Sequence, residues 1–381
     1  MATLTTTHAP AESASIDQNS FWLRNKKWDL LYITCSVIVT PLPYVLYLLG
    51  RDLFGIDDDL SRNIVNGFVA IAIGGPHMMS TFLRTGLDKN FKQHYPMLIR
   101  SSILIPMIVI SLAFLNLELL LTLFFAWAAL HVLHQVTYIA ELYNYKEYNY
   151  VRKEGSLSMT SRLIDYALIL TCLFPVAAYK IWHGTFQIGT NDLGSVIPEF
   201  FEQRWFFVTL SVIFGVALIA YIIKTINEWR TNHLNMPKTV FIVITVFVAF
   251  FTAFLPNLDT AFQGLNTWHS FQYLAITFYI IKIRQMYGDL KNDAPLVARF
   301  SASTKDSKGL YLLSTLLLVG SVVIFMLVYW LAGIVRPDMD VHQHFDTAYY
   351  TSILSFLWIH YFHDHFLFTD FETLDGAYQN T

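Results

Sequence analysis

Long apolar stretches separated by short polar segments run along nearly the whole chain. A membrane-spanning helix needs about 20 mostly apolar residues. Ten stretches meet this requirement: 28–49, 63–83, 97–115, 117–141, 163–183, 204–225, 238–256, 259–283, 309–334 and 345–368. The pattern predicts an all-α fold, a polytopic membrane bundle of about ten transmembrane helices in the lipid bilayer.

The composition agrees with a membrane protein. Of the 381 residues, 55% are hydrophobic and only 14% are charged, whereas soluble domains carry about 25% charged residues. The formal net charge of −3 provides no basic surface for nucleic acid, so we expect no nucleic-acid partner. Cys35 and Cys172 are the two cysteines and lie inside apolar runs, which argues against a disulfide framework and a thiolate metal site.

Lysine and arginine are concentrated on one side of this ten-span arrangement. Only five of the 25 fall on the other side: Arg51, Arg62, Lys180, Arg204 and Arg336. Because basic loops favour the cytoplasm, both termini are predicted to be cytoplasmic in a multi-pass protein of the cell (inner) membrane. The expected organisation is a polar cytoplasmic tail (1–27), a single transmembrane helical domain (28–368) and a short acidic C-terminal tail (369–381).

Seven of the 13 histidines fall in the interior of predicted spans, where ionisable side chains are costly and usually mark function. They lie on the second, fourth, eighth and tenth spans: His77, His131, His134, His269, His360, His363 and His365. At 1.5 Å per residue, they lie roughly 8–20 Å from the predicted inner ends of these spans. Four helices that offer imidazoles at one depth predict a buried metal site in the cytoplasmic half of the membrane.

Polar residues extend the histidine stripe on the fourth span. His131 and His134 are i, i+3 neighbours on one helix face. Gln135, Tyr138 and Glu141 continue that stripe toward the cytoplasmic end. These side chains are therefore candidates for the same site.

The tenth and eighth spans show similar stripes. His360 and His363 are also i, i+3 neighbours, and Asp364 lies beside them. His365 is about 200° from His363 on an ideal helix, so it serves a second metal, requires a local helix distortion, or is not a ligand. On the eighth span one polar face carries Asn266, His269, Gln272 and Tyr273.

The donor set favours metals that bind neutral imidazole, which are Fe, Zn, Cu and Ni. Seven histidines exceed the needs of one ion, so we expect two metal ions, with iron the best candidate. Glu141, Asp364 or Asn266 would complete a ligand shell. Imidazole ligands need an orienting partner for the outer ring N–H, and the candidates are Gln135, Gln272, Asn266, Asp165 and Asp364. Tyr138 and Tyr273 either donate protons and line the pocket or simply pack.

Two short motifs resemble those of known membrane enzymes. His131-Val-Leu-His134-Gln135 and His360-Tyr-Phe-His363-Asp364-His365 resemble the histidine boxes of integral-membrane non-haem di-iron oxygenases and desaturases. The boxes HxxxH and HxxHH themselves do not occur. Gly75-Pro76-His77 is similar to the Pro-His motif of the Brp/Blh carotene-cleaving membrane enzymes. The resemblance implies use of O2 as co-substrate to hydroxylate, desaturate or oxidatively cleave a lipophilic small molecule.

This chemistry also implies an external electron donor, because the chain carries no flavin or iron–sulfur motif. A reductase or ferredoxin-type electron carrier would dock at the basic loops 84–100 and 282–308, although cytoplasmic orientation alone explains their charge. Two other functions stay open. One is a haem-binding electron-transfer protein, with histidines as axial ligands. The other is a proton- or metal-coupled transporter, with the histidines as a relay or transient metal site.

Overall fold

The apolar stretches of the sequence form long helices. The computed structural model describes residues 21–151, 158–188, 191–256, 258–339 and 341–369. Within these residues the only strands are β1 (Gln187–Ile188) and β2 (Asn191–Asp192), which pair antiparallel with Gln187 opposite Asp192. The predicted all-α class is confirmed.

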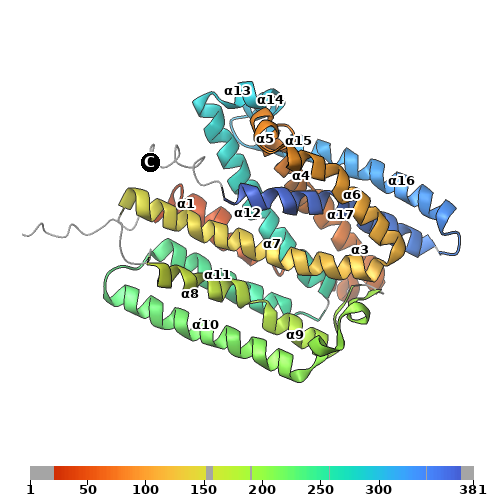
Figure 1. The fold of residues 1–381 in the computed structure, drawn as a ribbon, viewed down its shortest axis with the longest axis horizontal. Helices are drawn as coiled ribbons and strands as arrows, with labels where there is room; N and C mark the ends of the chain where they lie inside the picture. Colours follow the sequence, from red (N-terminus) through yellow and green to blue (C-terminus); the bar gives the residue numbers. More distant parts are fainter. Residues whose placement is uncertain (1–20, 152–157, 189–190, 257, 340, 370–381) are drawn as a thin grey trace, which may run out of the picture.

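The helical elements follow one another with short connections (Figure 1). Those of the first half are α1 (Lys26–Trp28), η2 (Asp29–Thr34), η3 (Cys35–Val39), α2 (Leu42–Leu48), η4 (Leu49–Leu53), α3 (Asp58–Val69), η5 (Ala70–Gly74), α4 (Gly75–Arg84), α5 (Lys89–His94), α6 (Pro96–Leu115), α7 (Leu117–Lys146) and η6 (Glu147–Val151). Those of the second half are α8 (Met159–Thr171), α9 (Phe174–Trp182), η7 (Leu193–Val196), η8 (Glu199–Glu202), α10 (Arg204–Arg230), α11 (Met236–Ala253), α12 (Leu258–Tyr287), α13 (Leu290–Asp293), α14 (Pro295–Ala302), α15 (Lys308–Leu317), α16 (Val319–Val335) and α17 (Val341–Leu367).

Seven helical segments of the described residues are long and apolar enough to cross a membrane. They are Lys26–Leu53, Pro96–Leu115, Leu117–Asn149, Met159–Trp182, Arg204–Arg230, Met236–Ala253 and Lys308–Val335. Each coincides with one of the ten predicted spans. These helices indicate a membrane protein.

The other three predicted spans are also helical. They correspond to the continuous run α3–η5–α4 and to α12 and α17. At about 1.5 Å per residue, the 30 residues of α12 and the 27 of α17 exceed the roughly 30 Å of a bilayer core. Their polar residues make them less apolar than the seven helical segments above. These three runs carry five of the seven histidines assigned to spans. Ten crossings and cytoplasmic termini therefore stay predictions.

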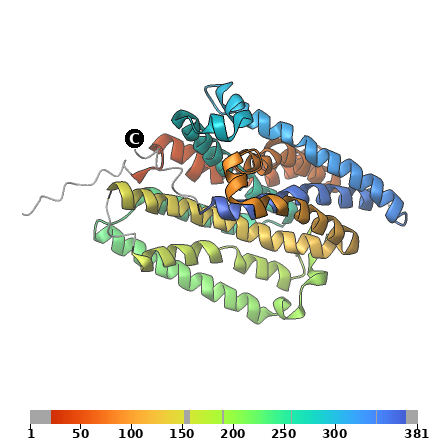
Figure 2. The same cartoon turned by 45° about the horizontal axis from the view of Figure 1, so that its top comes forward.

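The helices form a bundle around α7 and α12. Figures 1 and 2 show α8, α9, α10 and α11 on one side of α7, and α4, α6, α16 and α17 on the other. One apolar core joins α7 to α8, α11 and α12, and a second joins the first half of α7 to α4, α6 and α17. Because α7 belongs to both cores, its middle turns lie at the centre of the molecule.

The outermost helices present apolar side chains to the surroundings. On α10, Val212 and Ile219 are more than half exposed, and on α16 Val323 and Met326 are as well. Such continuous apolar surface is typical of helices that face lipid.

The first described residues pack against α7 instead of extending away from it. The Asp29 carboxylate accepts hydrogen bonds from the backbone N–H of Leu23 at 2.6 Å and from the Tyr143 hydroxyl at 3.0 Å. Phe21 is fully buried. The described part of the chain thus begins within the predicted 1–27 tail, whose residues 1–20 lie outside the described residues, as do residues 370–381 of the acidic tail.

Candidate metal centre

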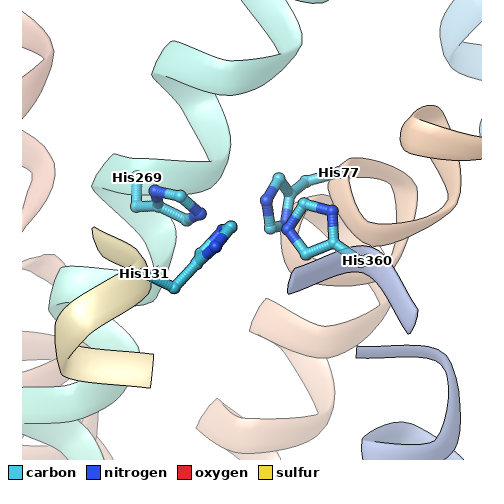
Figure 3. Close-up of side chains that lie close together, drawn as sticks. All are labelled: His77, His131, His269 and His360. Carbon is cyan, nitrogen blue, oxygen red and sulfur yellow. The ribbon is translucent and has the colours of Figure 1, made fainter. Parts of the chain in front are cut away.

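Four imidazoles from four separate helices meet at the centre of the bundle. They belong to His77 on α4, His131 on α7, His269 on α12 and His360 on α17. Figure 3 shows the four rings facing a common space. One nitrogen from each ring lies within 4.8 Å of the corresponding nitrogens of the other three. We call these residues the four-histidine cluster.

The helix that carries His77 is shaped by the residues just before it. Pro76 has no N–H, and its ring crowds the carbonyl four residues earlier, which belongs to Ala72. The run Ala70–Gly74 is π-helical, and the Tyr311 hydroxyl of α15 donates to the Ala72 carbonyl at 2.5 Å. A π-helical turn of this kind is frequent at functional sites, and here it sets the angular position of His77.

Gly75 allows α4 to approach its neighbour closely. A Cβ at this position would lie 2.6 Å from the Leu318 side chain and 2.5 Å from the Ala70 carbonyl oxygen. Only glycine fits without displacing these atoms. The Gly-Pro-His motif of the sequence therefore places Gly75, two residues before His77, against the α15–α16 junction.

The cluster is closed to solvent. His77 and His360 are completely buried, and His131 and His269 expose no more than 4% of their surface. The His77 ring centroid lies 4.3 Å from that of His360 and 4.8 Å from that of His269. The His131 centroid lies 4.8 Å from that of His269 and 4.9 Å from that of His360.

The Nε2 atoms of all four rings lack a hydrogen-bond partner. In two of the rings the other nitrogen is engaged. His77 Nδ1 lies 3.3 Å from the Gly74 carbonyl oxygen, and His360 Nδ1 lies 2.5 Å from the Thr81 hydroxyl. When Nδ1 carries the proton, the Nε2 lone pair is free, which is the usual arrangement of a metal-binding histidine. Four buried nitrogens without partners are otherwise costly, so the donor set fits a metal ion.

A polar network supports His360 from behind. The Thr81 hydroxyl contacts the Tyr273 hydroxyl at 2.7 Å and the Asp364 Oδ1 atom at 3.1 Å, and Tyr273 donates to Asp364 at 2.7 Å. The Asp364 Oδ2 atom lies 3.3 Å from His360 Nδ1 and 3.8 Å from His131 Nε2, with no hydrogen bond assigned. Asp364 therefore lies at the rim of the cluster, and Tyr273 belongs to its support.

Aromatic rings cover the His131 side of the cluster. The His131 ring stacks on Tyr361 with centroids 4.1 Å apart and on Phe368 at 5.7 Å. Phe368 also stacks on Tyr138 at 5.0 Å. Tyr138 is thus one ring removed from His131.

The structure brings together only some of the histidines that were expected to converge. His363 points toward α6, where its Nε2 lies 3.0 Å from the Leu98 carbonyl oxygen, and its Nδ1 lies 3.2 Å from the Thr85 hydroxyl. His134 is partly exposed and His365 is exposed; their rings pair with each other at a centroid distance of 5.4 Å. His134, His363 and His365 therefore do not join the four-histidine cluster. His134 and His363 lie about 60° around their helices from His131 and His360, and His365 lies about 140° from His360.

Two predicted orienting residues act on the backbone of α12 and not on imidazole rings. The Gln135 side chain donates to the His269 carbonyl at 3.1 Å and to the Gln272 side chain at 3.3 Å. Gln272 in turn donates to the Ile33 carbonyl. These bonds fix α7, α12 and the N-terminal helices against one another.

The predicted ligand Glu141 and the predicted orienting residue Asp165 lie in different networks. Glu141 accepts hydrogen bonds from Arg162 and Tyr166. Asp165 forms ion pairs with Lys224 and Lys238, the second at 3.1 Å. Both carboxylates thus have local partners outside the cluster.

Histidines assigned to loops also lie outside the cluster. His94 Nδ1 contacts the Asn90 carbonyl oxygen at 2.9 Å, and the His183 ring lies 4.3 Å from Tyr179. These two residues are suitable controls for metal binding.

A mostly apolar cavity of about 280 Å³ lies about one helical turn from the cluster, and none of the four histidines lines it. Gly74, Asn266 and Leu357 line it, and each precedes a cluster histidine by three residues, or about one helical turn. Phe124 lines it as well, two turns before His131. The predicted site residue Asn266 therefore belongs to the wall of this cavity, which we call the central cavity.

Sequence reasoning missed Thr81 and the central cavity. Thr81 follows His77 by four residues and so lies on the same helix face, a signal that was present in the sequence. The cavity could not be predicted, because its walls come from helices whose mutual packing the sequence pattern leaves open.

Comparison with known proteins found no matching family model, no matching curated protein and no matching solved structure. The arguments for function therefore rest on the site itself.

Proposed function

We propose that this protein is a membrane-embedded oxidoreductase that binds one iron ion in the four-histidine cluster. It would use O2 to hydroxylate, desaturate or oxidatively cleave a lipophilic molecule in the central cavity. The observation that carries this proposal is the set of four buried Nε2 atoms without hydrogen-bond partners, about one helical turn from an apolar cavity.

The donor set favours a single ion. Imidazole nitrogens bind such ions at about 2.0–2.1 Å, so ligand nitrogens lie roughly 3.4 Å apart around a tetrahedral ion. The ligand nitrogens of the cluster lie up to 4.8 Å apart, and small rotations of the rings would bring them to the shorter distances required around an ion. The second ion expected from seven histidines has fewer supporting groups, since His134 and His365 form only a pair.

Iron accounts for the adjacent cavity better than zinc does. Four histidines would saturate a tetrahedral zinc ion and make it structural. Iron accepts further ligands, and when bound it would supply O2 chemistry that no protein side chain provides. An external electron donor, a reductase or ferredoxin-type carrier, remains part of this proposal.

The side chains of this protein would position the metal ligands, exclude water from the site and hold a proton close to it. Thr81 and Asp364 hold His360 by its Nδ1 side, which fixes the ring for binding through Nε2. Tyr273 holds a proton 2.7 Å from Asp364, next to the cluster. Burial of all four rings excludes water, which protects reactive species from side reactions.

The geometry favours this proposal over a haem protein. A haem places its macrocycle between two axial ligands, whereas here four imidazoles converge with ring centroids as close as 4.3 Å. The rings themselves occupy the space that a macrocycle would need. A strong Soret band in the purified protein would contradict this argument.

Metal analysis of purified protein tests the site. We expect about one iron per chain after purification in detergent, and Mössbauer spectra of a mononuclear centre. Alanine variants of His77, His131, His269 and His360 should each lose most of the iron, whereas His94→Ala and His183→Ala should retain it. Equal loss in all six variants, or no metal in the parent protein, would refute the metal centre.

Isotope labelling tests the reaction. The iron-loaded protein is incubated with a total membrane lipid extract, a reductant and 18O2, and products are identified by mass spectrometry. We expect a lipophile that gains 18O or loses two hydrogen atoms, and no such product with the His269→Ala variant. Iron binding without any O2-dependent product would leave a structural metal and contradict the oxidoreductase.

A further inference from the structure

A second, larger apolar cavity lies on the other face of the α7–α12 pair. Its volume is about 540 Å³, and its walls come mainly from α7, α9 and α12. Leu123 and Leu130 of α7 line it and are 45% and 52% exposed. The cavity is therefore open toward the surroundings of the bundle, where lipid chains lie if these helices span a membrane. We call it the lateral cavity.

The lateral cavity is adjacent to the central cavity. Phe125 of α7 and Phe262 of α12 line both, and their ring centroids are 4.7 Å apart. These two side chains form the partition between the cavities. Aromatic rings turn without any change in the backbone, so a long apolar molecule can occupy both spaces when the rings rotate.

One charged side chain lies in this otherwise apolar wall. Lys180 of α9 is the only charged residue that lines the lateral cavity among the described residues, and it is 5% exposed. Its ammonium group donates one hydrogen bond, to the Leu255 carbonyl at 2.8 Å. No carboxylate of the described residues lies within ion-pair distance. An ammonium group can donate three hydrogen bonds, which is more than the one that Lys180 donates to Leu255.

Buried cations in an apolar environment usually have an anionic partner or mark a binding site. The cavity provides the apolar space, and Lys180 provides the charge at its wall. A molecule that fills both requirements has a long apolar part and one acidic end group. Access from the bilayer between Leu123 and Leu130 suits such a molecule, because it is itself a lipid.

We propose that the lateral cavity binds the acid-bearing end of an elongated lipophile, with Lys180 as the partner of its carboxylate. The other end of the molecule then passes Phe125 and Phe262 into the central cavity. Only the assignment of that second end as the reacting part rests on the proposed function. Binding in the lateral cavity itself needs no metal.

Fluorescence of cis-parinaric acid and its methyl ester tests this proposal in the metal-free protein. The parent protein should bind the acid more tightly than the ester. Because a buried hydrogen bond to a charged group is worth roughly 1.5–3 kcal/mol, Lys180→Met should weaken acid binding by about 10-fold to 100-fold. It should leave ester binding nearly unchanged, and Lys180→Arg should restore most of the affinity for the acid.

A second variant tests the cavity independently of the charge. Ala177 lines the lateral cavity, so Ala177→Phe should weaken both acid and ester. Val216 lies on the exposed face of α10, and Val216→Phe is the matched control that should change neither.

Two results would overturn the proposal. One is that Lys180→Met binds the acid and the ester as tightly as the parent protein does. This result would mean that Lys180 only donates to a backbone carbonyl near the end of α11. The other is unchanged binding in Ala177→Phe. Neither result affects iron binding by the four-histidine cluster, so failure of this proposal and failure of the metal centre are distinguishable.

Discussion

Thr81→Val is the most informative single substitution near the cluster. It preserves the shape of the side chain but removes the hydroxyl that contacts His360, Tyr273 and Asp364 at 2.5, 2.7 and 3.1 Å. No metal-binding nitrogen is changed. The variant therefore asks whether the support behind His360 matters to the metal.

The expected loss of metal affinity depends on the contacts that His360 keeps in Thr81→Val. Loss of an orienting partner typically lowers metal affinity by about 10-fold to 100-fold. Asp364 Oδ2 lies 3.3 Å from His360 Nδ1 without a hydrogen bond. A small ring rotation would let it replace the lost hydroxyl, so we expect the lower end, about 10-fold. That factor corresponds to about 1.4 kcal/mol of metal-binding free energy.

Competition between the protein and the chelator ferrozine for Fe²⁺, without O2, measures this affinity. Thr85→Val is the matched control, because Thr85 is buried one turn later on the same segment and contacts His363, which is outside the cluster. We expect a shift for Thr81→Val and none for Thr85→Val, with thermal unfolding monitored for both. Equal shifts, or no shift in Thr81→Val, would refute the supporting role.

Three further predictions concern the same region. Asp364→Asn should weaken iron binding by about 10-fold or more because an amide nitrogen replaces one of the two carboxylate oxygens that contact Tyr273 and His360, and the same chelator competition measures this change. His134→Ala and His365→Ala should keep full iron content in metal analysis, and loss of iron from either would restore a second metal site. Gly75→Ala should lower stability by about 1–3 kcal/mol because its Cβ overpacks the α15–α16 junction. Gly67→Ala is the control, since a Cβ there meets nothing within 4 Å, and it should not lower stability. Thermal unfolding in detergent distinguishes the two variants.

Much of the helical architecture could be predicted from the sequence. Seven of the ten predicted spans coincide with helices that are apolar enough to cross a membrane. The remaining three are helices as well, and their polar residues reflect the site that they build. Hydrophobic length is a local property, which is why it can be read from one sequence.

The site was predicted less completely than the helices. His77, His131, His269 and His360 share a depth that the span positions indicate, and they converge. The i, i+3 spacing made His134 and His363 natural ligands, and hence natural targets for removing metal. Their helices are turned so that only the first histidine of each pair faces the cluster. Helix rotation depends on tertiary packing, which the spacing within one helix does not contain.

The π-helical turn before His77 has a consequence for how this site tolerates change. One residue corresponds to about 100° of helix rotation. A π-helical turn holds about one residue more than an α-helical turn. If Ala70–Gly74 kept all five residues but wound as an ordinary α-helix, the following residues would rotate by about the 100° of one residue relative to α3. His77 would then swing away from its three partners, while the helix kept almost the same length and apolarity. Changes that convert this π-helical turn into an α-helical one without removing a residue are thus a more severe threat to the centre than most substitutions in the lipid-facing helices.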